Sequence, residues 1–153
     1  EILVLGGCDA DSQAIQGECS SVSKTTYSFD PVSDAFTTRE DMPVKRFRSA
    51  AVNVSNHVYL FGGRDLDGAL VCTVDRYDVI TGTWESLNST QDTNCFSDHS
   101  GVATDDGTMY LFGGWDELYV AQSTVVKVEV SGDGLVYSNA SEPMGEASVH
   151  VCC

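Results

Sequence analysis

The sequence lacks any apolar run long enough to cross a bilayer. Its apolar runs are short, as in Ile2–Leu5 and Val58–Phe61, whereas a transmembrane helix needs about 20 residues. We therefore expect no membrane insertion. An initial Met and a visible signal peptide are also missing, because the chain starts at Glu1 and enters a strand-like stretch, residues 2–7, at once. We expect that chain has been removed from, or is unseen at, the front of this stretch.

Basic residues are scarce. Eight Lys and Arg stand against 23 Asp and Glu, which gives a formal net charge of −15. A field of that sign repels phosphate backbones and anionic lipid, so nucleic-acid binding and binding to a membrane surface are both disfavoured. Cationic partners and metal ions remain compatible with it. A purely solubilising role for the acids is the plainer interpretation.

No Cys-x-x-Cys pair occurs, so a zinc site has little support. Six cysteines are dispersed along the chain, at positions 8, 19, 72, 95, 152 and 153. Three Asn-x-Ser/Thr sequons accompany them, at Asn53, Asn88 and Asn139, and are candidates for glycosylation. An even number of cysteines together with sequons favours an oxidising compartment. We therefore expect an extracellular or organelle-lumen location rather than the cytoplasm.

Sustained helical periodicity is absent as well, and a repeated strand motif takes its place. The stretch Val58–Gly63 recurs as Met109–Gly114 at an offset of 51 residues, and Ile2–Gly7 is a third copy 56 residues before the middle one. Each copy is a short hydrophobic strand that ends in Gly-Gly.

A second motif follows each glycine doublet. Tyr77–Trp84 matches Phe29–Phe36 at an offset of 48 residues, and Val128–Tyr137 is a degraded third copy. Short β-branched segments and turn residues, such as Asp106-Gly107, fill the spaces between the motifs. Each unit therefore contains four short strands in about 50 residues, which is typical of an all-β chain built from propeller blades.

The pattern resembles the kelch family of β-propellers. The residues that carry the resemblance in the middle unit are Met42-Pro43, Arg46, Gly62-Gly63, Tyr77-Asp78 and Trp84. The first unit has Phe29 and Phe36 at the Tyr and Trp positions, and the third has Glu129 and Tyr137 near the Asp and Trp positions. The resemblance implies an all-β propeller of four-stranded antiparallel blades, with six or seven blades in all.

The blade units run approximately over residues 1–46, 47–96 and 97–146, and a first strand of a further blade covers 147–153. We therefore expect an incomplete propeller of about three blades. An open arc exposes two apolar blade faces to water. The remainder of the propeller is expected from the same or another chain, and a bound neighbour that covers the two faces is the alternative.

The loops after the glycine doublets begin with acidic residues and lie on one face of such a propeller. Their acidic side chains are Asp9, Asp11, Asp65, Asp67, Asp116 and Glu117. The resemblance implies that this face binds a protein partner. Three interpretations stay open for the acids: a site for a basic partner, a site for Ca²⁺, which prefers carboxylate oxygens, and a solvated rim.

Four cysteines belong to the same end of the predicted blades. Cys8 and Cys19 flank the first doublet loop, Cys72 closes the next one, and Cys95 follows that blade's fourth strand. The preferred pairing is Cys8–Cys19 and Cys72–Cys95, because each bridge closes a polar loop that burial cannot hold. Cys152 and Cys153 can pair with chain elsewhere or with each other.

No catalytic motif is evident. Ser97-Asp98-His99 contains the letters of a triad, but adjacency in sequence is not triad geometry. His99 and His150 fall near first strands, which line a propeller channel, and Arg46 and Arg48 are expected to bind loop carbonyls more often than a partner's carboxylate. We therefore predict a non-catalytic protein-interaction module with no cofactor apart from the calcium alternative. The other two hypotheses are a structural subunit of a larger assembly and the propeller of a galactose-oxidase-like secreted copper enzyme.

Overall fold

The computed structural model describes residues 1–8, 19–89, 95–132, 134–140 and 144–145. Within these ranges the chain forms β-strands and no helix, so it contains no helix with the length and hydropathy of a bilayer-spanning segment. The strands are β1 (Ile2–Cys8), β2 (Val22–Asp30), β3 (Ala35–Thr38), β4 (Ala50–Val54), β5 (His57–Phe61), β6 (Val74–Asp78), β7 (Thr83–Ser89), β8 (Ser100–Ala103), β9 (Met109–Phe112), β10 (Val125–Ser131) and β11 (Gly134–Asn139).

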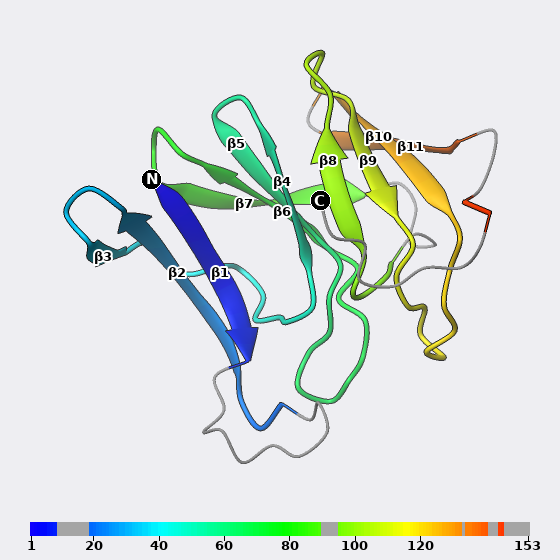
Figure 1. The fold of residues 1–153 in the computed structure, drawn as a ribbon, viewed down its shortest axis with the longest axis horizontal. Coiled ribbons are helices and arrows are strands. Elements are labelled where there is room, and N and C mark those ends of the chain that lie inside the picture. Colours follow the sequence, from blue (N-terminus) through cyan, green and yellow to red (C-terminus); the bar gives the residue numbers. More distant parts are fainter. Residues whose placement is uncertain (9–18, 90–94, 133, 141–143, 146–153) are drawn as a thin grey trace.

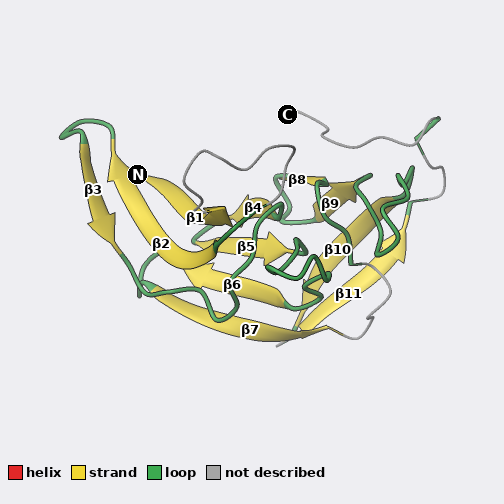
Figure 2. Ribbon diagram, turned by 90° about the horizontal axis from the view of Figure 1, so that it is seen from below, coloured by secondary structure: helices red, strands yellow, loops and turns green. Residues whose placement is uncertain are grey.

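Three antiparallel meanders follow one another along the chain (Figure 1). We call them blade 1 (β1–β3), blade 2 (β4–β7) and blade 3 (β8–β11). Blades 2 and 3 meet at a short parallel pairing between β7 and β11, where Gly134 lies opposite Asn88 and Leu135 opposite Ser89. Strands β4 and β8 lie on one side of the array and β7 and β11 on the other (Figure 2). The predicted all-β blade architecture is thereby confirmed, and the strand expected at 147–153 lies outside the described residues.

The main hydrophobic core lies between blades 2 and 3. Every second residue of the blade 2 strands points to the face that packs against blade 3, and side chains of blade 3 pack against it from the other side. The buried side chains are Val52, Tyr59, Phe61, Val74, Leu87, Phe96, Met109, Leu111, Val126, Val128, Leu135 and Tyr137. Each buried aliphatic or aromatic side chain contributes on the order of 1.5–3 kcal/mol to folding. The two sheets are therefore held face to face by side-chain burial.

Blade 2 packs on blade 1 through its other face. The Trp84 indole N–H lies 3.1 Å from both Thr26 Oγ1 and the Glu40 carbonyl oxygen, and donates to these two acceptors on the blade 1 side. Tyr77 is buried next to Trp84, with ring centroids 5.1 Å apart. The aromatic residues of the second motif therefore fill the wedge between neighbouring blades.

The glycine doublet marks a close backbone contact between consecutive blades. Gly62 and Gly63 have φ angles of +58° and +93°, and the Gly63 N–H donates to the Phe96 carbonyl oxygen at 3.0 Å. A Cβ atom on Gly62 would lie 2.1 Å from that same oxygen. Only glycine fits this backbone conformation and this approach, which explains why each repeat carries the doublet.

Candidate functional site

The loops that follow the glycine doublets of blades 2 and 3 share one backbone structure. We call residues 64–71 and 115–122 the doublet loops. In the first, the Asp65 N–H donates to Ala69 O at 3.0 Å; in the second, the Asp116 N–H donates to Val120 O at 3.2 Å. Isolated bridges pair Arg64 with Leu70 and Trp115 with Ala121. The two loops therefore present side chains from matching positions on adjacent blades.

Two of the predicted acidic residues hold these loops in shape. Asp65 Oδ1 accepts the backbone N–H groups of Asp67 and Ala69 at 3.0 and 2.9 Å. Asp116 Oδ1 accepts those of Leu118 and Val120, both at 2.9 Å. An aspartate that accepts backbone N–H groups two and four residues later is a structural turn residue. This role was missed in the sequence, although an Asp at the start of a tight loop is its usual signal.

The other predicted acids differ in their placement. Asp67 and Glu117 are exposed at the tips of the doublet loops. Asp9 and Asp11 lie outside the described residues. Among the residues that the structure does describe, no three His, Cys, Asp or Glu side chains come together as a metal site. Binding of Ca²⁺ or of a basic partner at these acids stays a prediction.

Apolar side chains are exposed at the same loop tips, and the sequence analysis missed them. The exposed fractions are 45% for Leu66, 81% for Leu118, 50% for Tyr119 and 52% for Val120. The signal available in the sequence was the run Leu118-Tyr119-Val120 inside a loop, where polar residues are usual. Clustered exposed apolar side chains mark interaction surfaces more often than single ones do.

A buried arginine joins the two doublet loops. The Arg64 guanidinium donates to Ser97 Oγ at 3.0 Å and to the carbonyl oxygens of Gly68 and Asp116, both at 2.6 Å. Its Cζ also lies 3.7 Å from the centroid of the Tyr119 ring, a cation–π contact. Ser97 Oγ accepts a hydrogen bond from Arg64, so Ser97 helps to hold the two doublet loops together.

A second arginine, Arg46, lies buried inside blade 2. It forms an ion pair with Asp75 and donates to the Gly62 and Thr73 carbonyl oxygens at 3.2 and 2.8 Å. Asp75 Oδ1 also accepts the Ser86 hydroxyl at 2.6 Å. Burial lowers the pKa of Arg46, and the Asp75 carboxylate opposes that shift. The predicted bonds to loop carbonyls are confirmed, whereas the ion-pair partner was not foreseen.

The histidines do not assemble a catalytic site in the described part of the chain. His99 is buried, burial lowers its pKa to about 4, and its Nδ1 has no hydrogen-bond partner among the described atoms. His57 Nε2 lies 3.7 Å from Asp78 Oδ2 at a half-exposed hairpin. His150 lies outside the described residues. His99 is therefore a buried packing residue whose imidazole stays neutral down to an unusually low pH.

Two disulfide bonds join the loops as expected. Cys8 is bonded to Cys19 with a Cα–Cα distance of 5.6 Å, and Cys72 to Cys95 with one of 5.0 Å. The pairing preferred from the sequence is confirmed. Cys152 and Cys153 lie outside the described residues. The Cys72–Cys95 bond ties the end of the doublet loop at residues 64–71 to the segment that enters blade 3.

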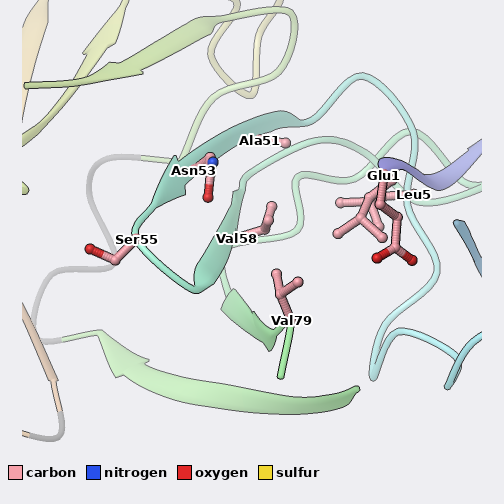
Figure 3. Close-up of a pocket in the computed structure, with 8 residues that line it drawn as sticks. Glu1, Leu5, Ala51, Asn53, Ser55, Val58 and Val79 are labelled. Atoms are coloured by element: carbon pink, nitrogen blue, oxygen red, sulfur yellow. The ribbon is translucent and has the colours of Figure 1, made fainter. Parts of the chain in front are cut away.

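The three sequon asparagines lie on strands. Asn53 is on β4, Asn88 on β7 and Asn139 on β11. Asn53 and Asn139 are both exposed, and Asn53 also lines a cavity between blades 1 and 2 (Figure 3). Glycosylation at any of the three stays a prediction.

That cavity has a volume of about 320 Å³ and lies between β1 and the β4–β5 hairpin. Its lining combines apolar side chains with polar groups at Glu1, Asn53 and Ser55 (Figure 3). The apolar lining residues are Leu3, Leu5, Ala51, Val58 and Val79.

The family model described as "Kelch motif" matches residues 45–91, which span blade 2. An F-box/kelch-repeat protein of Arabidopsis thaliana is 27% identical over 130 residues, which cover 84% of this chain and 32% of that protein. Kelch-like protein 38 of Homo sapiens is 31% identical over 129 residues, which cover 84% of this chain and 20% of that protein.

Beta-scruin of Limulus polyphemus is 29% identical over 76 residues, which cover 50% of this chain and 8% of that protein. The chain thus spans between 8% and 32% of the length of these three curated relatives. The matches agree with the doublets and aromatic motifs of the repeat and with the meanders that these motifs form. The chain belongs to the kelch-repeat family, and its described residues form blades of a kelch-type β-propeller.

Proposed function

We propose that this chain is a non-catalytic protein-interaction module whose two doublet loops hold a protein partner. One observation carries the proposal: matching loops on adjacent blades present exposed apolar tips, Leu66 and residues 118–120, on a backbone that is hydrogen-bonded to an aspartate in each loop. Kelch-repeat proteins generally mediate protein–protein interactions, which supports the same conclusion. Apolar anchors on a pre-organised backbone lose little conformational entropy on binding.

The partner that fits this surface is basic as well as apolar. Asp67 and Glu117 are exposed beside the apolar tips, and the one basic residue of the two doublet loops, Arg64, is buried and engaged in hydrogen bonds. The net charge of −15 adds a long-range attraction for cationic partners. Such a field chiefly raises the association rate and falls off with added salt.

A location in the secretory pathway is part of the proposal. The two disulfide bonds support it, because such bonds persist in oxidising compartments. Mass spectrometry of the protein isolated from its native source under thiol-blocking conditions tests this. Cys72 and Cys95 recovered as alkylated free thiols would argue for a reducing compartment.

A displayed random-peptide library tests the interaction surface. Selection on the chain is expected to enrich peptides that combine Lys or Arg with large apolar residues, and their binding to weaken about tenfold or more in Leu118→Asp. Ile80→Asp is the matched control, because Ile80 is exposed on the β6–β7 turn, at the opposite end of β6 from the doublet loop. Enrichment of acidic peptides, or equal loss of binding in both variants, would contradict the proposal.

A further inference from the structure

The Cys72–Cys95 disulfide links the two doublet loops to each other. Cys72 directly follows the loop at residues 64–71, and Cys95 lies two residues before Ser97. The Ser97 N–H donates to the carbonyl oxygen of Trp115, the first residue of the other loop, at 3.0 Å, and the Trp115 N–H donates back to the Ser97 carbonyl oxygen at 2.8 Å. The disulfide therefore connects the loop of blade 2 covalently to a segment that is hydrogen-bonded to the loop of blade 3.

The two doublet loops differ in how their ends are held. In the loop of blade 3, the Gln122 side-chain amide donates to Asp116 Oδ2 at 2.9 Å. The residue at the same place in the loop of blade 2 is Val71, whose side chain cannot make this bond. Cys72 comes directly after it. The loop of blade 2 thus has a disulfide at the end that a side-chain hydrogen bond holds in the loop of blade 3.

The disulfide can be reached by a thiol from the side of Cys72. Cys72 is exposed, whereas Cys95 is half-buried. Access decides which sulfur atom of a disulfide is attacked in thiol–disulfide exchange. The Cys72 sulfur is therefore the one that an attacking thiolate meets first.

We propose that the Cys72–Cys95 bond is a redox switch for the surface formed by the two doublet loops, an inference that rests on the function proposed above. With the bond intact, the loops keep the spacing that holds the partner. With the bond reduced, the loop of blade 2 loosens and the partner is released. Affinity falls because a loosened loop must be ordered again when the partner binds, at a cost in conformational entropy.

The reductant is a dithiol, such as the thiol pair of a disulfide reductase. One thiolate of the dithiol attacks Cys72 Sγ, the bond between the two sulfur atoms breaks, and Cys95 leaves as a thiolate that takes up a proton. The second thiol of the reductant then attacks the mixed disulfide and releases Cys72 as a thiol. The chain gains two electrons and two protons, and the dithiol is oxidised to a disulfide.

The effect of reduction is expected to be local. The buried core between blades 2 and 3 includes neither cysteine. The hydrogen bonds from Arg64 to Ser97 Oγ and to the Asp116 carbonyl oxygen do not depend on the sulfur atoms. Reduction is therefore expected to loosen residues 64–71 without unfolding the blades.

Two variants isolate one disulfide each. Both carry Cys152→Ser and Cys153→Ser, so that no further thiol exchanges with the bonds. The first variant also carries Cys8→Ser and Cys19→Ser and keeps only the Cys72–Cys95 bond, whereas the second, the matched control, carries Cys72→Ser and Cys95→Ser and keeps only the Cys8–Cys19 bond.

Dithiothreitol is expected to act on the doublet loops of the first variant alone. There it speeds hydrogen exchange of the amides in residues 64–71 about tenfold or more, while exchange in β5 stays unchanged. It also weakens binding of the peptides selected from the displayed library about tenfold, and reoxidation restores their binding. The second variant already has the fast exchange and the weak binding, with or without dithiothreitol.

Reduction and reoxidation of the first variant decide the inference even if the second variant does not fold. Unchanged exchange in residues 64–71 would overturn it, as would equally accelerated exchange in β5, which would make the bond a support of the whole fold. Faster loop exchange with unchanged peptide binding would overturn the switch and leave the proposed function standing. A library that yields no basic and apolar peptide would overturn the proposed function, and this inference with it.

Discussion

Two arginines in blade 2 and its loop, Arg46 and Arg64, are almost fully buried and yet serve different contacts. Arg46 has a carboxylate partner inside its own blade. Arg64 instead donates to the Ser97 hydroxyl and to carbonyl oxygens of its own loop and of the next doublet loop, and it contacts the Tyr119 ring. Burying a charge is costly unless it is paired and hydrogen-bonded. Removing either arginine, or one of its partners, is therefore expected to leave a buried polar group without a hydrogen bond.

Arg46→Ala is predicted to destabilise the fold by about 3–5 kcal/mol, because it leaves the Asp75 carboxylate buried without its partner. Urea unfolding of the variant measures this. Arg76→Ala is the control, since Arg76 pairs with the exposed Glu85 and such pairs contribute about 1 kcal/mol or less. Equal losses in the two variants would show that the Arg46–Asp75 pair is not buried.

His99 is predicted to make stability fall as the pH is lowered from about 6.5 to about 4. Its pKa is about 4 in the fold against 6.5 as the ordinary value, so between these pH values the unfolded chain binds the extra proton. The loss amounts to on the order of 3 kcal/mol. Hydrogen bonds from Thr104 and Thr108 lower the pKa of Asp106 to about 2, so that carboxyl acts below this range.

Urea midpoints measured across this pH range check the prediction. His99→Gln is expected to flatten the pH dependence, whereas His57→Gln, at a half-exposed hairpin, is expected to retain it. A steep dependence that survives in His99→Gln would mean that another group titrates.

At the scale of single elements, the doublet loops owe their shape to one aspartate each. Tyr119 shows how firmly they are held: it has a φ of +57° where the equivalent residue of blade 2 is Gly68 at +82°. A bulky residue in the left-handed region is strained. Its contact with Arg64 and the Asp116 hydrogen bonds compensate that strain.

Asp116→Ala is predicted to cost about 1–2 kcal/mol and to speed hydrogen exchange in residues 115–122, because two backbone N–H groups lose their acceptor. Glu117→Ala, whose side chain is exposed on the same loop, is the control and is expected to leave exchange unchanged. Unaltered exchange in Asp116→Ala would show that the carboxylate does not hold the loop.

The strands were predictable from the sequence and the site was predictable only in part. The second motif was identified at Phe29–Phe36, and it covers the end of β2, a turn and the start of β3, because short strands separated by turn residues are a local signal. The partners of Arg46 and Arg64 come from residues 29 and 52 positions away in the chain. No local pattern encodes such contacts, so the pairing of Asp75 with Arg46 and the bond from Arg64 to the Asp116 carbonyl oxygen required the fold.

At the scale of the whole molecule, the face of blade 1 that points away from blade 2 is apolar and exposed in the part of the chain that the structure describes. Its exposed residues are Ile2, Val4, Tyr27 and Phe36. In the repeat, Ile2 and Phe36 correspond to Val58 and Trp84, which face blade 1 from blade 2. The open face therefore has the side chains of a blade interface.

This face is predicted to bind the hydrophobic dye ANS. Substituting both Ile2 and Phe36 by Lys is expected to reduce ANS fluorescence at least about twofold, because apolar surface is what the dye binds. Val32→Lys, on a highly exposed turn, is the control and should change it little. Unchanged fluorescence in the double variant would show that the face is covered in solution.

The packing of blade 2 against blade 3 is predicted not to tolerate a side chain at position 101, which is occupied by Gly101. A Cβ atom there would lie 2.5 Å from Val52 Cγ2 of the neighbouring blade, and such overpacking costs about 1–3 kcal/mol. Thermal unfolding of Gly101→Ala checks this. Gly145→Ala, with no atom within 4 Å of its added Cβ, serves as the neutral control.

The central claim is that blade 1 packs face to face on blade 2, and blade 2 on blade 3. Proton–proton NOEs measured in solution test this claim most directly. The account predicts cross-peaks from the Val52 methyls to Gly101 Hα, and from the Trp84 indole N–H to the Thr26 side chain. Loss of either contact, with cross-peaks that instead join β1 directly to β9 or β10, would contradict it.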